Sequence, residues 1–206
     1  MLRLGKDAVT ATTVALAALL PVLAIYFTAT PSDELAESEL PTAVVSHAIP
    51  TFDPAYVTDD VLWLARCIYS ETKKAHEQEL VAWVIRNRVE TGYRGQHTYE
   101  GTVLDPYQFS AFNPGSSKRR LYTTLMPESN SASFAQALRV AHDVYYASAD
   151  KRPFPETTRH FYSERSMVGR KAPRWAEGQQ PVTPVKHRVD PKRFRFYSGL
   201  ASTVLL

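Results

Sequence analysis

Residues 59–71 read DDVLWLARCIYSE and follow Thr58, and this stretch decides the fold. Its apolar side chains recur at the spacing of a helix with one buried face: Val61, Leu64, Ala65 and Ile68. Thr58 can cap the helix, and Asp59 and Asp60 suit its positive N-terminal end. We therefore predict an amphipathic helix packed against a core.

Glu71 lies at the end of this helix, on the flank of the apolar stripe beside Leu64 and Cys67. Burial and the negative C-terminal end of the helix dipole would both raise its pKa and keep the carboxyl protonated. A protonated carboxyl is suited to act as a general acid. The residues alone leave open that Glu71 is an ordinary surface residue near a helix end.

A second amphipathic helix is predicted over residues 77–89, with Leu80, Val81, Val84 and Ile85 as its buried stripe and Trp83 on the far side. Arg88 falls on the apolar face. An arginine there needs a carboxylate or carbonyl partner, and we interpret it as half of a structural ion pair. A third helix is expected over residues 132–148.

Several other chemistries are excluded by the motifs. His76-Glu77 begins an HExxH pattern, but Leu80 and Val81 stand where the second histidine is needed. The six histidines show no pair at metal-ligand spacing, no GxSxG serine motif occurs, and Cys67 is the only cysteine. We therefore expect no metal and no cofactor, and acid catalysis remains.

Six short stretches together resemble the SleB-type cell wall hydrolase family. They are LARCIYSET at 64–72, LVAWVIRNRV at 80–89, GTVL at 101–104, QFS at 108–110, HFYS at 160–163 and PRWA at 173–176. Their order and spacing match as well, and the resemblance covers about residues 60–180. Residues 1–57 lie outside it.

The resemblance implies a mainly helical, lysozyme-like α+β domain with a small β element. It also implies cleavage of the MurNAc–GlcNAc bond of peptidoglycan, commonly by a lytic transglycosylase, with Glu71 in the position of the catalytic glutamate. A neutral Glu71 would protonate the glycosidic oxygen, and its carboxylate would then take the proton from the C6 hydroxyl as a 1,6-anhydro ring closes. Two alternatives stay open: a hydrolysing muramidase with Asp105 or Glu100 as second carboxylate, and a catalytically silent wall-binding protein.

Six residues are predicted to bind the substrate: Gln108, Phe109, Ser110, His160, Tyr162 and Trp175. His160 and Tyr162 fall in a strand-like run, so they share one face while Phe161 points to the other. Phe109 can instead belong to the core. Trp175 can serve as a sugar platform or simply pack the C-terminal segment.

The N-terminal residues 1–30 look like a membrane-directed segment. Arg3 and Lys6 precede an uncharged stretch over residues 8–27, which fits an uncleaved signal anchor or a signal peptide. The positive-inside rule then places the rest outside the cytoplasm, in the cell envelope, or free of it if the leader is cleaved. Residues 31–57 read as an acidic, proline-containing linker, and residues 58–206 as the catalytic domain.

Charge is distributed unevenly along the chain. Residues 61–206 hold 22 of the 24 basic and 13 of the 21 acidic residues, a formal charge of +9 against +3 for the whole chain. Such a domain favours an anionic partner. Export argues against nucleic acid, so we expect peptidoglycan glycan strands as the partner, with the membrane contacted through the N-terminal segment.

Overall fold

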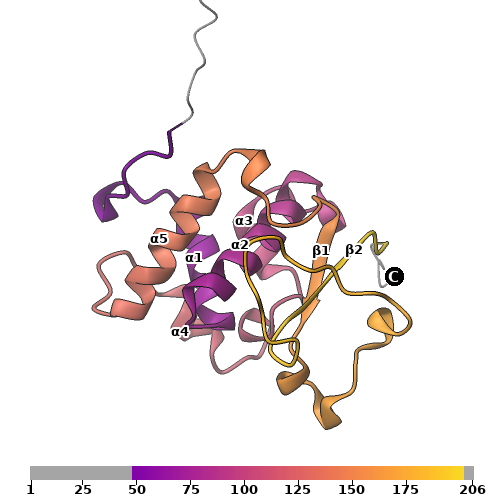
Figure 1. The fold of residues 1–206 in the computed structure, drawn as a ribbon. Helices are drawn as coiled ribbons and strands as arrows, with labels where there is room; N and C mark the ends of the chain where they lie inside the picture. The colour runs from indigo at the N-terminus through magenta and orange to yellow at the C-terminus, as the bar shows by residue number, and fades with distance from the viewer. Residues whose placement is uncertain (1–47, 202–206) are drawn as a thin grey trace, which may run out of the picture. The chain divides into compact units, whose positions relative to one another are not determined.

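The computed structural model describes residues 48–201, which form five α-helices and a small two-stranded sheet (Figure 1). The helices are α1 Asp59–Glu71, α2 Ala75–Glu90, α3 Tyr99–Leu104, α4 Arg119–Thr123 and α5 Ala132–Tyr146, and the strands are β1 Thr158–Tyr162 and β2 Arg195–Ser198. Short 3-10 turns occupy Pro54–Tyr56, Tyr93–Gly95, Ser110–Phe112, Ala149–Lys151, Glu164–Ser166, Val168–Arg170 and Arg174–Ala176. This composition confirms the predicted α+β class.

Helix α1 forms as the sequence predicts. The Thr58 hydroxyl accepts a hydrogen bond from the Val61 amide at 3.3 Å and caps the first turn. The predicted stripe is buried, with Leu64, Ala65 and Ile68 fully inaccessible to solvent. The helix packs against α5, α2 and α3, so its last residue is held by the core of the domain.

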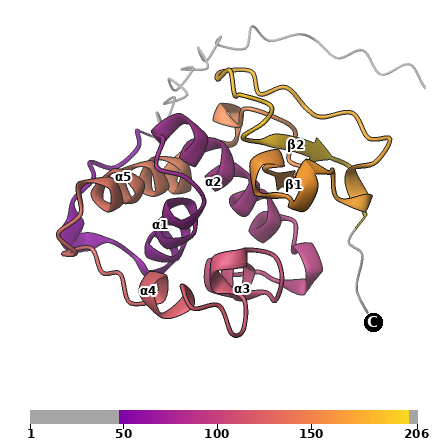
Figure 2. The same cartoon turned by 90° about the horizontal axis from the view of Figure 1, so that it is seen from below.

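Helix α2 runs through the middle of the domain and contacts α1, α3, α5 and β1 (Figure 2). The prediction that Trp83 lies on a far, outer side is therefore wrong, because this side chain is only 1% exposed. Its ring lies beneath two guanidinium groups, those of Arg86 at 4.9 Å and Arg152 at 5.4 Å. When a helix is enclosed on all sides, the spacing of its apolar residues does not indicate an outward face, because it has none.

The two strands are antiparallel, with His160 opposite Tyr197 and Phe161 opposite Phe196. The predicted alternation is confirmed. Phe161 packs on Phe109 and Phe196 on the core side, whereas His160 and Tyr162 both face the ring of Trp175. The sheet therefore presents a polar and aromatic face away from the core.

A long irregular segment joins β1 to β2, and α2 anchors it. Asn87 donates from Nδ2 to the carbonyl of Thr158 at 2.9 Å, which fixes the start of β1. Farther along, His187 and Arg193 bond to carboxylates of α2. This irregular segment is thus fixed to the domain at several points.

The predicted membrane segment at residues 1–30 and most of the predicted linker lie outside the described residues. Among residues 48–201, no helix is both long and apolar enough to cross a membrane. The described end of the linker, residues 48–57, contains only the turn Pro54–Tyr56 before α1.

Candidate active site

Glu71 is the last residue of α1, and its carboxyl is surrounded by protein on most sides while part of its surface stays accessible. Within the described residues it makes no ion pair or hydrogen bond. Burial raises its pKa from 4.5 to about 7, and the nearby positive charge of Arg88 offsets a part of this rise. The predicted rise in the pKa of Glu71 is confirmed with burial as its cause, and the carboxyl is half protonated near neutral pH.

Arg88 is the buried cation of the site, with only 5% of its surface exposed. Its Nε donates to the carbonyl of Arg159 at 2.7 Å, and its guanidinium lies over the rings of Phe109 at 5.1 Å and Tyr93 at 5.2 Å. The predicted ion pair is wrong: within residues 48–201 its close partner is a carbonyl. Nη1 is buried without a hydrogen-bond partner there. The guanidinium has no carboxylate partner in this part of the chain, and its positive charge favours the ionised form of Glu71.

His160 lies close to this arginine. Its Nε2 and the Tyr93 hydroxyl are 2.9 Å apart and share a hydrogen bond. Burial and the charges of Arg88 and Arg159 lower the pKa of His160 to about 4, so the ring is neutral at neutral pH. Its Nδ1 is buried and has no partner among the described residues. This nitrogen is therefore both unpaired in this part of the chain and closed off from solvent.

Tyr162, Trp175 and Tyr197 form an aromatic cluster on the outer face of the sheet. The Trp175 ring meets those of Tyr162 and Tyr197 edge-on, at 5.8 Å and 5.4 Å, and its centroid is 5.3 Å from that of His160. Trp175 remains 36% exposed. It therefore packs the C-terminal segment and keeps an exposed apolar surface, while its role as a sugar platform stays a prediction. Tyr162 is buried, at 8% exposed, within the cluster.

The three predicted loop residues 108–110 differ in their exposure to solvent. Phe109 is 1% exposed and packs between Arg88 and Phe161, so it belongs to the core; the prediction that it stacks on a sugar is corrected, because a buried ring has no free face. Gln108 is partly exposed. Ser110 is exposed and lines a polar pocket of about 460 Å³ with Asn113 and Lys118.

The two alternative carboxylates differ in their surroundings. Asp105 forms an ion pair with Arg94, with 2.6 Å between Oδ2 and Nε, and its side chain is 9% exposed. Glu100 is exposed in the first turn of α3. Neither shares the unpaired, desolvated surroundings of Glu71.

A buried ion pair that the sequence analysis missed fixes the segment after Glu71. Arg193 donates to both carboxylate oxygens of Glu77, at 2.6 and 2.7 Å, and Thr72 donates its hydroxyl to the same carboxylate at 2.6 Å. Burial alone would raise the pKa of Glu77, but these hydrogen bonds and the Arg193 charge outweigh it and lower the pKa. Thr72 follows Glu71 directly, so the C-terminal tail helps to hold the candidate acid.

Other residues near Glu71 are aromatic or cationic. Tyr122 is close enough for the Glu71 charge to contribute to its raised pKa, after burial and Tyr69. Lys73 lies over the ring of Tyr69, 3.0 Å from its centroid. Within the described part of the chain, no group of three or more His, Cys, Asp or Glu side chains is arranged to hold a metal ion.

Comparison with known proteins gives one match. A family model described as cell wall hydrolase matches residues 72–189, which is more than half of the chain. The match begins one residue after Glu71 and includes Arg88, His160 and Trp175. Neither the curated proteins nor the solved structures contain a significant match to the chain.

Proposed function

The chain belongs to the SleB-type cell wall hydrolase family, an assignment that makes it an enzyme acting on peptidoglycan, and on this premise we propose that it is a lytic transglycosylase with Glu71 as its single acid and base. The observation that carries the proposal is the state of Glu71. It is a desolvated carboxyl without an ion-pair partner in the described chain, with a pKa near 7, at the end of a rigid helix. Such a group is poised to give and retake a proton at neutral pH.

The proposed reaction uses both protonation states of Glu71. The protonated carboxyl gives its proton to the oxygen of the MurNAc–GlcNAc bond as the bond between that oxygen and the sugar C1 breaks. The resulting carboxylate removes the proton of the C6 hydroxyl, whose oxygen bonds to C1 and closes the 1,6-anhydro ring. The proton given in the first step is recovered in the second, so no water is consumed.

The surroundings of the other carboxylates support one acid rather than two. Arg94 holds Asp105 in an ion pair, whereas a water-activating base needs a carboxylate that is free to accept a proton. Glu100 lies exposed on α3. A hydrolysing muramidase is the second candidate, with Asp105 released from Arg94 when the substrate binds.

The sugar-binding surface in this proposal consists of the polar and aromatic face of the sheet together with the 108–110 loop. Trp175 offers a partly exposed ring, and His160, which is also partly exposed, lies beside it. Gln108 and Ser110 supply polar groups for hydroxyls. Tyr162 holds the Trp175 ring through an edge-on contact. A protein that only binds the wall could use the same surface, so lysis must be measured as well as binding.

The family places the protein in the cell envelope or outside the cell. We place the catalytic domain outside the cytoplasm because the uncharged stretch at residues 8–27 can direct export, as an anchor or a cleaved leader. Carbonate extraction of membranes distinguishes the two: an anchored chain stays in the pellet, and a cleaved chain is recovered without its leader.

Mass spectrometry of digested sacculi tests the reaction type. The proposal expects muropeptides with 1,6-anhydro ends from the wild type and the same products from Asp105→Asn. Reducing ends without anhydro ends, together with loss of activity in Asp105→Asn, would establish the muramidase instead. No soluble product from a folded wild-type protein would leave only a wall-binding role.

A further inference from the structure

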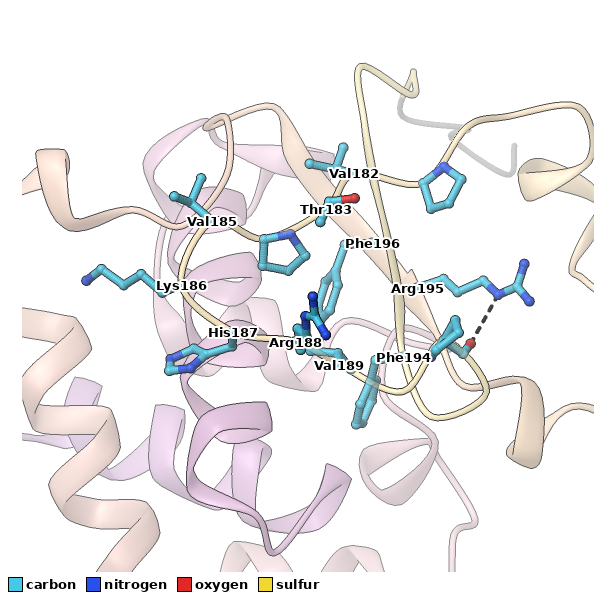
Figure 3. Close-up of a pocket in the computed structure, with 13 residues that line it drawn as sticks. Val182, Thr183, Val185, Lys186, His187, Arg188, Val189, Phe194, Arg195 and Phe196 are labelled. Atoms are coloured by element: carbon cyan, nitrogen blue, oxygen red, sulfur yellow. Dashed lines mark hydrogen bonds between the residues drawn. The ribbon is translucent and has the colours of Figure 1, made fainter.

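The segment between β1 and β2 encloses a pocket that plays no part in the proposed reaction. Its volume is about 570 Å³, and residues 181–196 supply its lining. This size is within the range of pockets that hold small ligands. Figure 3 shows the loop curving around the pocket in front of α2.

The loop is held in place at both ends and in its middle. Val182 donates its amide to the carbonyl of Phe196 at 2.8 Å, and Val185 donates to that of Pro153 at 3.0 Å. His187 bonds through Nε2 to Glu79 of α2 at 2.7 Å, and Arg193 forms the buried pair with Glu77. These contacts tie the pocket walls to the helical core, so the pocket is part of the fold.

The pocket combines an apolar floor with a cationic rim. Val185 and Val189 give it accessible apolar surface, whereas Phe194 and Phe196 pack behind the lining and are almost fully buried, at 5% and 1% exposed. Lys186, Arg188 and Arg195 contribute positive charges, and no Asp or Glu is among the lining residues. A ligand that matches this lining carries a negative charge next to small apolar groups.

Arg188 is the cation that is free to bind such a ligand. Arg195 is already paired with Glu164 at 2.9 Å, whereas the side chain of Arg188 has no hydrogen bond or ion pair within residues 48–201. Figure 3 shows Arg188 turned toward the space inside the loop and Lys186 turned away from it. The nearby acids are also engaged, since Glu79 bonds to His187 and Asp190 pairs with Arg165 at 2.8 Å.

The geometry points to a binding site for the carboxylate end of a peptide stem of peptidoglycan. Arginine binds carboxylates through two parallel hydrogen bonds, and the valine and proline residues of the lining suit small aliphatic side chains. This inference rests on the proposed substrate and adds to it a second point of recognition, on the peptide rather than the glycan. Through Arg193, Glu77 and Thr72, the pocket loop is also connected to the segment next to Glu71.

Calorimetric titration of the full-length protein with a free stem tetrapeptide tests the site, and it needs no turnover. We expect saturable binding by the wild type and binding about tenfold or more weaker in Arg188→Gln, because a charge-assisted contact is lost. The matched control is Arg139→Gln, which removes an exposed charge from α5. It is expected to bind like the wild type.

Three results would overturn the inference: no peptide binding by the wild type, equal binding by Arg188→Gln, or equal affinity for the tetrapeptide and its carboxyl-amidated form. Displacement of the peptide by inorganic phosphate at equal affinity would assign the pocket to phosphate polymers instead. Lysis of purified walls is measured in parallel. If the wild type does not lyse the walls, the proposed function is rejected. Peptide binding would still show whether the pocket binds the stem.

Discussion

Replacing Glu71 with glutamine is expected to stabilise the protein at alkaline pH. The wild-type carboxyl is desolvated and unpaired among the described residues, so its ionised form is disfavoured in the folded state. Glutamine has nearly the same shape as the protonated acid and never ionises. The variant therefore avoids a cost that the wild type bears whenever the carboxyl loses its proton.

The size and sign of the effect follow from the two pKa values of Glu71. The folded-state pKa is about 7 and the ordinary value is 4.5, so the folded state binds the proton more tightly. This contribution is fully present below pH 4.5 and is lost as pH rises through 7. The difference corresponds to about 3 kcal/mol at pH 8, and to less where water reaches the carboxyl. At pH 4 the two proteins are expected to be equally stable.

Urea unfolding at pH 4, 6 and 8 measures this difference directly. The matched control is Glu128→Gln, which removes an exposed carboxylate between α4 and α5. The control should follow the wild type at every pH. Glu71→Gln with no gain in unfolding free energy at pH 8, or with the same gain at pH 4, would show that ionisation of Glu71 does not destabilise the folded state.

Three further predictions concern the surroundings of Glu71. Arg193→Met is expected to cost about 2 kcal/mol in urea unfolding at pH 7, because buried Glu77 loses its cation; an unchanged midpoint would contradict this. Arg88→Met removes the charge that restrains the Glu71 pKa, so the alkaline limb of the pH–activity profile should move above about 7, and an unmoved limb would argue against the coupling. Trp175→Ala should reduce retention on insoluble walls several-fold and also lower stability, because the ring packs on Tyr162 and Tyr197; equal retention by the folded variant would remove Trp175 from the binding surface.

The sequence was informative where a structural element has one buried face. The spacing of apolar residues in residues 59–71 correctly predicted α1, its Thr58 cap and the flank position of Glu71. The alternation of His160, Phe161 and Tyr162 likewise predicted which side chains face away from the core. In both elements the contrast between apolar and polar positions records the direction of the core.

The same reasoning failed for α2, which is enclosed on all sides. Trp83 is buried under two arginines rather than facing outward. Arg88 has a carbonyl as its close partner instead of a carboxylate, because β1 brings the backbone of Arg159 against the helix. The spacing of apolar residues describes one helix at a time and does not predict where a strand packs on it.

Long-range pairs were beyond sequence reasoning for a related reason. Glu77 and Arg193 lie 116 residues apart, and each appears in the sequence as an ordinary charged residue. Only the path of the tail across α2 brings them together. Phe109 shows the same limit: the QFS stretch indicated a site loop, but the packing of Phe161 and Arg88 decides that its ring is buried.

Product analysis of purified sacculi treated with wild type and Glu71→Gln side by side decides whether Glu71 performs the chemistry. Urea unfolding of both proteins confirms that the variant is folded. We predict 1,6-anhydro muropeptides from the wild type and none above background from the variant. Anhydro products released by Glu71→Gln at the wild-type rate would exclude Glu71 as the acid and base of the reaction.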